Sequence, residues 1–269
     1  MKRTILITII TVLSVMGLYA KGNNITCSGS TTVLPVAQAA AEAFMDKNPS
    51  VNISVRGGGS GVGVAALQNG TADIGNSSRP MKAKEITQCK SKGINPTPYA
   101  VANDGIAIVV HKNNPVKNIT IAQITAIYTG KIKNWSAVGG PNLPIVVISR
   151  DVASGTFEMF NEKALKGAKV ESSAQMLASN NAIVTTVAST PGGIGYAGLG
   201  YVTDDIRVVS VENVIPSENT VKNGTYKMAR KLYMFTNGKA TGEVARFISF
   251  IQSAEGQALV VRQGFISLN

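Results

Sequence analysis

Short apolar runs alternate with helical periodicity along most of the chain. Residues 51–55, 105–110 and 145–148 are rich in β-branched side chains, and the last two runs are apolar throughout, as buried strands are. Apolar residues at helical spacing predict helices over 35–47 and 241–252. The same signals predict strands at 24–26, 73–75 and 231–235, and helices at 62–68, 80–90, 121–127, 157–165 and 254–261. This alternation predicts an α/β fold.

Two of these strands indicate how the chain is divided. The apolar runs 105–110 and 231–235 bracket a central block of about 120 residues, the size of a small domain. If both strands cross between the parts, the chain forms two α/β lobes joined by a two-strand hinge.

The first twenty residues have the layout of a secretory signal peptide. Lys2 and Arg3 precede an apolar run over 5–18, and Ala20 offers a small residue at a cleavage point. An N-terminal membrane anchor is the alternative, but the run is short for a full span. We therefore expect residues 1–20 to be removed and the protein to be exported to the periplasm.

The charge balance is basic because acidic residues are scarce. The chain has 26 Lys and Arg against 15 Asp and Glu, a formal net charge of +11, and only 15% of its residues are charged. Removal of Lys2 and Arg3 leaves 24 − 15 = +9. The basic residues are scattered and are not interleaved with aromatic residues, so we expect no nucleic-acid partner.

The two cysteines, Cys27 and Cys89, are candidates for a disulfide. Export brings the chain into an oxidising compartment, where cysteines usually pair. Two unrelated buried thiols are the alternative.

Glycine and hydroxyl residues gather where predicted strands lead into predicted helices. The three segments are 29–32, 59–61 and 154–156, which contain the candidate residues Ser30, Thr31, Ser60, Ser154, Gly155 and Thr156. A helix N-terminus presents free N–H groups and partial positive charge, so three converging termini would bind an anion. Ordinary N-capping is the alternative for each segment taken alone.

Arg150 and Asp104 refine the expected ligand. Arg150 follows an apolar strand, and ligands of open α/β sheets bind at the carboxyl ends of strands. Its guanidinium suits a phosphate-like oxyanion, whereas a surface salt bridge with Asp151 is the alternative. A carboxylate at Asp104 would accept a hydrogen bond from a protonated oxyanion and repel a fully ionised one. An ordinary turn in the Asn-Asp-Gly sequence is the alternative for Asp104.

Several kinds of enzyme site are disfavoured. The chain has one histidine, His111, and two cysteines, so we expect no metal site, no cofactor and no His-dependent triad. The glycine-rich segment at 61–66 lacks the acidic residue that a dinucleotide fingerprint carries about 20 positions later.

In these segments the sequence resembles the periplasmic phosphate-binding proteins that serve phosphate-uptake ABC transporters. The resemblance covers the chain from Asn24 to Leu268 and is carried by GSTTVLP at 29–35, RGGGSGVGVAAL at 56–67, ADIGNSSRPM at 72–81, NDGIAIVV at 103–110, IYTGKIKNW at 127–135, ISRDVASGTFEMF at 148–160, GGIGYAGLGY at 192–201 and SAEGQALV at 253–260.

The resemblance implies a two-lobed type II periplasmic-binding-protein fold with the ligand in the cleft between the lobes. One lobe would comprise 23–108 plus 232–269, and the other 109–231. The implied phosphate-binding residues are Ser30, Thr31, Ser60, Asp104, Arg150, Ser154, Gly155 and Thr156. Longer members carry their ligand-facing Asp in the segment corresponding to 75–81; its absence here makes Asp104 the candidate for that role. Arg79 would be a second ligand contact or, as we favour, a charge that closes the lobes.

The function implied is capture of inorganic phosphate and delivery to a membrane-embedded ABC permease by a monomeric protein that is not an enzyme. Two alternatives stay open: a binding protein for sulfate or molybdate, and an exported phosphatase-like hydrolase.

Overall fold

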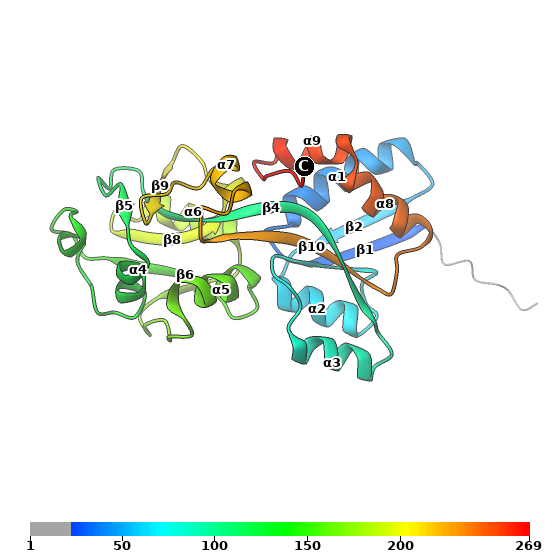
Figure 1. Ribbon diagram of the computed structural model, residues 1–269, viewed down its shortest axis with the longest axis horizontal. Helices are drawn as coiled ribbons and strands as arrows, with labels where there is room; N and C mark the ends of the chain where they lie inside the picture. Colours follow the sequence, from blue (N-terminus) through cyan, green and yellow to red (C-terminus); the bar gives the residue numbers. More distant parts are fainter. Residues whose placement is uncertain (1–22) are drawn as a thin grey trace, which may run out of the picture.

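Two lobes share one continuous sheet (Figure 1). The computed structural model describes residues 23–269, so the predicted signal peptide at 1–20 lies outside the described residues. In the described part of the chain, no helix combines the length and the apolar character needed to span a bilayer.

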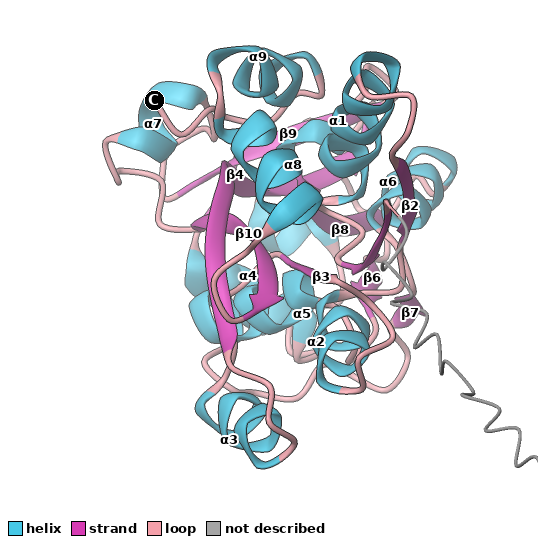
Figure 2. Ribbon diagram, turned by 90° about the vertical axis from the view of Figure 1, so that its right-hand side faces the viewer, coloured by secondary structure: helices cyan, strands magenta, loops and turns pink. Residues whose placement is uncertain are grey.

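The first lobe is built mainly from the two ends of the chain. Its elements are β1 (Asn24–Gly29), α1 (Leu34–Lys47), β2 (Asn52–Arg56), α2 (Ser60–Gln68), β3 (Ile74–Ser77), α3 (Ala83–Ser91), α8 (Gly242–Gln252) and α9 (Ala254–Arg262). Helices α1, α8 and α9 cover one face of the sheet, and α2 and α3 lie on the other (Figure 2).

The second lobe holds the central part of the chain. Its strands are β5 (Asn118–Ile119), β6 (Val146–Arg150), β7 (Gln175–Leu177), β8 (Gly193–Gly198) and β9 (Ile206–Val211). Its helices are α4 (Ile121–Tyr128), α5 (Gly155–Phe160), α6 (Asn180–Ser189) and α7 (Glu218–Lys222), with short 3₁₀ turns at Trp135–Val138 and Leu199–Tyr201.

Two strands run from one lobe into the other. β4 (Pro96–His111) and β10 (Ala229–Asn237) pair antiparallel, and the sheet order is β2-β1-β3-β10-β4-β8-β6-β7, with β9 on β4 and β5 on β9. β10 adds to β3 in the first lobe, while the later part of β4 pairs with β8 in the second. The predicted pair of crossing strands is therefore present, although β4 is 16 residues long, against the six that its apolar run suggests.

Separate hydrophobic cores support the lobes. The first-lobe core includes Val36, Phe44 and Phe247 from the helices on one face of the sheet. The second-lobe core includes Trp135 and Phe160. Along β4 the core contacts change from the first lobe at Val101 and Ala102 to the second at Ile106. The lobe boundaries at 108/109 and 231/232 stay predictions.

Most predicted strands and helices of both lobes are found within a few residues of their expected ends. The helix predicted at 157–165 is instead α5 followed by a π-helical turn over Asn161–Leu165. Strand β5 and all the elements from β7 to α7, these two included, have no counterpart in the predicted pattern.

The predicted disulfide is wrong in this structure. Cys27 and Cys89 are free thiols and both are buried. They belong to different hydrophobic clusters, Cys27 to the one beneath α1 and Cys89 to the one formed by α2, α3 and Phe235. Burial also raises the pKa of Cys27 to about 12, which suppresses the thiolate that disulfide formation requires.

Truncation of a first-lobe core residue tests the packing. Phe247 is fully buried and its ring centroid lies 5.6 Å from that of Phe44. We expect Phe247→Ala to lower the free energy of unfolding by about 3–5 kcal/mol, measured by chemical denaturation. Arg246→Gln, a change in the neighbouring surface residue, should cost below about 1 kcal/mol. Equal effects would contradict the assigned core.

Candidate functional site

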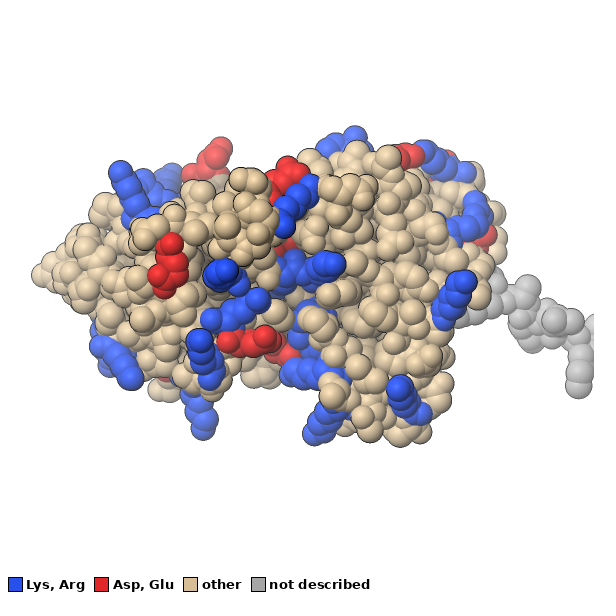
Figure 3. Space-filling model, in the orientation of Figure 1, with Lys and Arg blue, Asp and Glu red and all other residues tan. Residues whose placement is uncertain are grey.

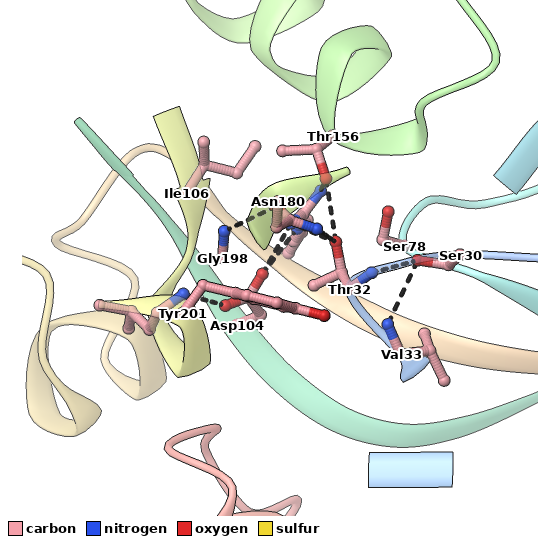
Figure 4. Close-up of polar contacts among 12 residues, drawn as sticks. Ser30, Thr32, Val33, Ser78, Asp104, Ile106, Thr156, Asn180, Gly198 and Tyr201 are labelled. Atoms are coloured by element: carbon pink, nitrogen blue, oxygen red, sulfur yellow. Dashed lines mark hydrogen bonds and ion pairs between the residues drawn. The ribbon is translucent and has the colours of Figure 1, made fainter. Parts of the chain in front are cut away.

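Three helix N-termini meet between the lobes. The segment before α1 and the start of α2 belong to the first lobe, and the start of α5 belongs to the second. The Thr32 and Thr156 hydroxyls lie 3.0 Å apart across this junction (Figure 4). Gly61 N donates to the Ala153 carbonyl at 3.0 Å. The structure therefore shows the lobes in contact at the predicted loops.

Gly155 fits this junction because it has no side chain. A Cβ atom there would lie 2.2 Å from Ser60 Oγ and 2.8 Å from Ser78 Oγ. On the facing segment, Gly59 has φ +101°, and its Cβ would lie 2.5 Å from the Ala153 carbonyl oxygen. Both positions need glycine for the two loops to approach so closely.

Two of the predicted serines accept backbone hydrogen bonds, Ser154 as the N-cap of α5 and Ser30 in the turn that precedes α1. Ser154 Oγ accepts from Phe157 N at 3.1 Å at the start of α5. Ser30 Oγ accepts from the N–H groups of Thr32 at 3.1 Å and Val33 at 3.3 Å. In these hydrogen bonds the serine oxygens are acceptors, so each O–H remains able to donate to a ligand.

Arg150 lies at the end of β6, and its guanidinium forms no ion pair with a carboxylate of the described residues. Its Nη2 donates to Thr31 Oγ1 at 3.2 Å and to the Ala178 carbonyl at 2.9 Å, and its Nε donates to the Leu177 carbonyl at 3.1 Å. The Nη1 group is buried without a hydrogen-bond partner, and within residues 23–269 no carboxylate lies at ion-pair distance. The alternative of a salt bridge with Asp151 is thus wrong. Burial lowers the pKa of Arg150 to about 10, which still leaves it charged at neutral pH.

Asp104 is fully buried and is paired with Arg230, a residue that the sequence analysis missed. Arg230 Nη2 lies 2.8 Å and its Nε 2.9 Å from Asp104 Oδ2, and Leu199 N donates to Oδ1 at 2.9 Å. Burial raises the pKa of the Asp104 carboxyl, and the Arg230 guanidinium opposes that rise. Arg230 also donates to Thr156 Oγ1 at 3.0 Å and to Thr32 Oγ1 at 3.3 Å. One ion pair therefore connects hydroxyls of both lobes.

Asn180, the first residue of α6, was also missed. Its Nδ2 donates to Thr31 Oγ1 at 3.1 Å and Thr32 Oγ1 at 3.0 Å, and its Oδ1 accepts from Gly198 N at 3.2 Å. A capping residue, Ser179, before apolar residues at helical spacing would have predicted this helix start.

The predicted residues thus come together. Ser30, Thr31, Ser60, Asp104, Arg150, Ser154, Gly155 and Thr156 all line one buried junction, which also holds Thr32, Ser78, Asn180 and Arg230. Two guanidinium groups and one carboxylate give the junction one net positive charge. Hydroxyls, helix N-termini and one unbalanced arginine can bind a small oxyanion.

The imidazole lies elsewhere. His111 is at the far end of β4, seven residues from Asp104, which corresponds to about 23 Å at about 3.3 Å per residue. Its Nδ1 accepts from Asn113 N. No general base of the kind that an activated serine needs is supplied by this histidine.

Comparisons with known proteins identify the family of this chain. The PBP superfamily domain model matches residues 19–255. The phosphate-binding protein PstS of Bacillus subtilis is 35% identical over 255 residues, which cover 94% of this chain and 83% of that protein. The corresponding protein of Pseudomonas aeruginosa is 32% identical over 268 residues, covering 91% of this chain and 83% of its own.

Solved structures give the same result. A Clostridium perfringens chain described as a phosphate ABC transporter substrate-binding protein with bound phosphate is 38% identical, with a TM-score of 0.85 and coverage of 91% of this chain and 100% of its own. An ABC-type phosphate transport receptor from Vibrio cholerae is 30% identical, with a TM-score of 0.75 and coverage of 90% and 99%.

The buried ion pair can be tested by a double-mutant cycle. Asp104→Asn and Arg230→Met should each lower the free energy of unfolding of the ligand-free protein by about 3–5 kcal/mol, because each leaves one buried charge unpaired. The double variant should lose less than the sum, since neither charge remains. Asp205→Asn, which removes a surface carboxylate 4.0 Å from Lys112, serves as the control and should cost below about 1 kcal/mol. Additive losses in denaturation curves would show that the two side chains do not interact.

Proposed function

The chain belongs to the PBP superfamily, in the family of the phosphate-binding proteins, and from this membership we propose that it binds inorganic phosphate between its lobes and delivers it to a membrane-embedded ABC permease. We further propose that the signal peptide at 1–20 exports it to the periplasm and that it acts as a monomer. The proposed ligand residues are Ser30, Thr31, Ser60, Asp104, Arg150, Ser154, Gly155 and Thr156, joined by Thr32, Asn180 and Arg230. Binding and release make and break no covalent bond, so the proposal includes no enzymatic step.

The observation that carries the proposal is the buried Nη1 group of Arg150. A guanidinium N–H without a partner inside the protein costs free energy unless a ligand accepts from it. It lies in a junction supplied by hydroxyls and helix N-termini, which are donors that suit an oxyanion. A phosphate oxygen accepting from Arg150 Nη1 would complete the arrangement.

Asp104 supports phosphate over fully ionised anions. Of about four acceptor positions on its carboxylate, Nε and Nη2 of Arg230 face the two on Oδ2, and Leu199 N takes one on Oδ1. The second position on Oδ1 can accept from a protonated phosphate oxygen. Sulfate has no proton to offer near neutral pH, so its oxygen would face a carboxylate without a hydrogen bond.

Closure of the lobes supplies the means of capture. The contacts Thr32–Thr156 and Gly61–Ala153 join the lobes at the proposed site. In the closed form, fixed donors replace the water around the anion. Separation along β4 and β10 would release it.

Titration calorimetry with inorganic phosphate tests the proposed function. We expect saturable 1:1 binding by protein freed of ligand by unfolding and refolding, and no turnover of a generic phosphoester. Arg150→Met should weaken binding by about 2–5 kcal/mol, because it removes a buried charged donor. Thr156→Val should weaken it by about 1–1.5 kcal/mol, the contribution of a single hydrogen bond. Absence of binding would refute the proposal, and equal losses would argue against a charge-dominated site.

Substitution of Asp104 tests the selectivity. Asp104→Asn removes the repulsion of ionised oxyanions and leaves Arg230 without its counter-charge. The ratio of phosphate to sulfate affinity in competition calorimetry should therefore fall at least about tenfold, chiefly through stronger sulfate binding. Asp205→Asn should leave the ratio unchanged. The proposed role is wrong if the unmutated protein binds both anions equally or if Asp104→Asn keeps the ratio.

A further inference from the structure

Four charged side chains bridge the lobes beside the site. Arg79, directly after Ser78, donates from Nη1 to Glu85 Oε2 at 2.8 Å and from Nη2 to Glu85 Oε1 at 2.7 Å. Its Nε lies 2.5 Å from Oε2 of Glu158, which belongs to α5 of the second lobe. Lys82 Nζ lies 2.8 Å from the same oxygen. Figure 3 shows acidic and basic side chains gathered where the lobes meet.

The centre of this group is largely shielded from water. The side chains of Arg79, Glu85 and Glu158 are 4%, 18% and 17% exposed, whereas Lys82 is 56% exposed. Two cations and two carboxylates balance one another. Ion pairs at this depth are screened less than surface pairs, so the loss of a partner has a larger effect.

Only one member of the group comes from the second lobe. If the lobes separate, Arg79 keeps Glu85, because both belong to the first lobe. Glu158 loses both of its cationic partners at once. The interlobe part of the network therefore exists only in the closed form, whereas the Arg79–Glu85 pair exists in both.

Arg79 and Glu158 each lie within two residues of a side chain at the interlobe junction. Ser78 packs with Ser60 against Gly155, and Arg79 is the next residue. Glu158 lies two residues after Thr156 on the same short helix. The ion pair thus acts on the relative position of the two binding segments without any need to touch the ligand.

We propose that Glu158 and Arg79 are positioning residues that form an interlobe clamp, which favours the closed lobes and slows ligand release; for phosphate as the ligand, this rests on the proposed function. The ligand enters the open form, in which the clamp is absent, and leaves only after the closed form has opened. The clamp therefore affects dissociation more than association. Arg79 is assigned by this inference to closure and not to ligand contact, the choice that the sequence left open.

Glu162 provides a matched control. It lies in the π-helical turn that follows α5, its side chain is exposed, and it lines the same interlobe groove of about 700 Å³ as Arg79 and Glu158. Within the described residues it forms no ion pair. Glu162→Gln therefore makes the same change of charge without breaking the clamp.

A first measurement follows closure without ligand. Spin labels at Gln88→Cys on α3 and Lys169→Cys in the second lobe report the interlobe distance, because both positions are exposed and the native thiols Cys27 and Cys89 are buried. We expect pulsed electron paramagnetic resonance to show that Glu158→Gln shifts the distribution of distances between the labels toward longer values. Glu162→Gln should leave it as in the parent.

A second measurement follows release of inorganic phosphate by stopped flow. Glu158→Gln should raise the dissociation rate about tenfold, equivalent to about 1.4 kcal/mol, with the association rate changed less than about twofold. Glu162→Gln should leave both rates unchanged, and Glu158→Asp, which keeps the charge, should recover part of the loss.

The clamp is overturned if Glu158→Gln changes neither the distances nor the dissociation rate, or if Glu162→Gln produces the same changes. Failure of the parent protein to bind phosphate refutes the proposed function instead. In that case, the distance distributions of the ligand-free protein still show whether Glu158 and Arg79 favour the closed lobes.

Discussion

The ion pair between Asp104 and Arg230 is the interaction on which the other contacts of the site depend. The two residues are cross-strand neighbours on β4 and β10, so the ladder of hydrogen bonds between these strands sets their separation. The same guanidinium holds the hydroxyls of Thr32 and Thr156, one from each lobe. The strands that connect the lobes therefore also place the donors of the site. A shift in their register would separate the carboxylate from the guanidinium and would break the hydrogen bonds of Arg230 to both threonines.

The parts of the site that could be predicted from the sequence depend on local structure. Ser60 and Ser154 stand at helix starts, and Ser30 lies in the turn before α1, because glycine and hydroxyl residues favour those positions, whatever the rest of the chain does. Arg150 emerges at the end of a strand that is recognisable by its apolar run. Most helices and strands were predictable for the same reason, since their periodicity and their end signals lie within a few residues of each other.

The parts that could not be predicted depend on which distant segments become neighbours. Arg230 lies 126 residues from Asp104, and only the pairing of β4 with β10 brings them together. Asn180 reaches Thr31 across 149 residues. The cysteines fail to pair for a related reason, because their separate clusters are a property of the folded sheet and not of the spacing between them. The resemblance indicated the segments that meet at the junction, but it did not supply these partners.

Charge acts at two levels in this protein. The formal net charge of +11 belongs to the whole sequence and can raise the rate at which anions arrive. The junction itself carries one net positive charge, because Asp104 cancels one of its two arginines. An unopposed pair of buried arginines would attract any small anion and would have no means of preferring a protonated one. In the proposed function, the carboxylate would lower the general attraction for anions and add an acceptor, so that selectivity would depend on a charge that opposes the ligand. Arg230 holds that carboxylate from the neighbouring strand, so this opposing charge is built into the pair of strands that connects the lobes.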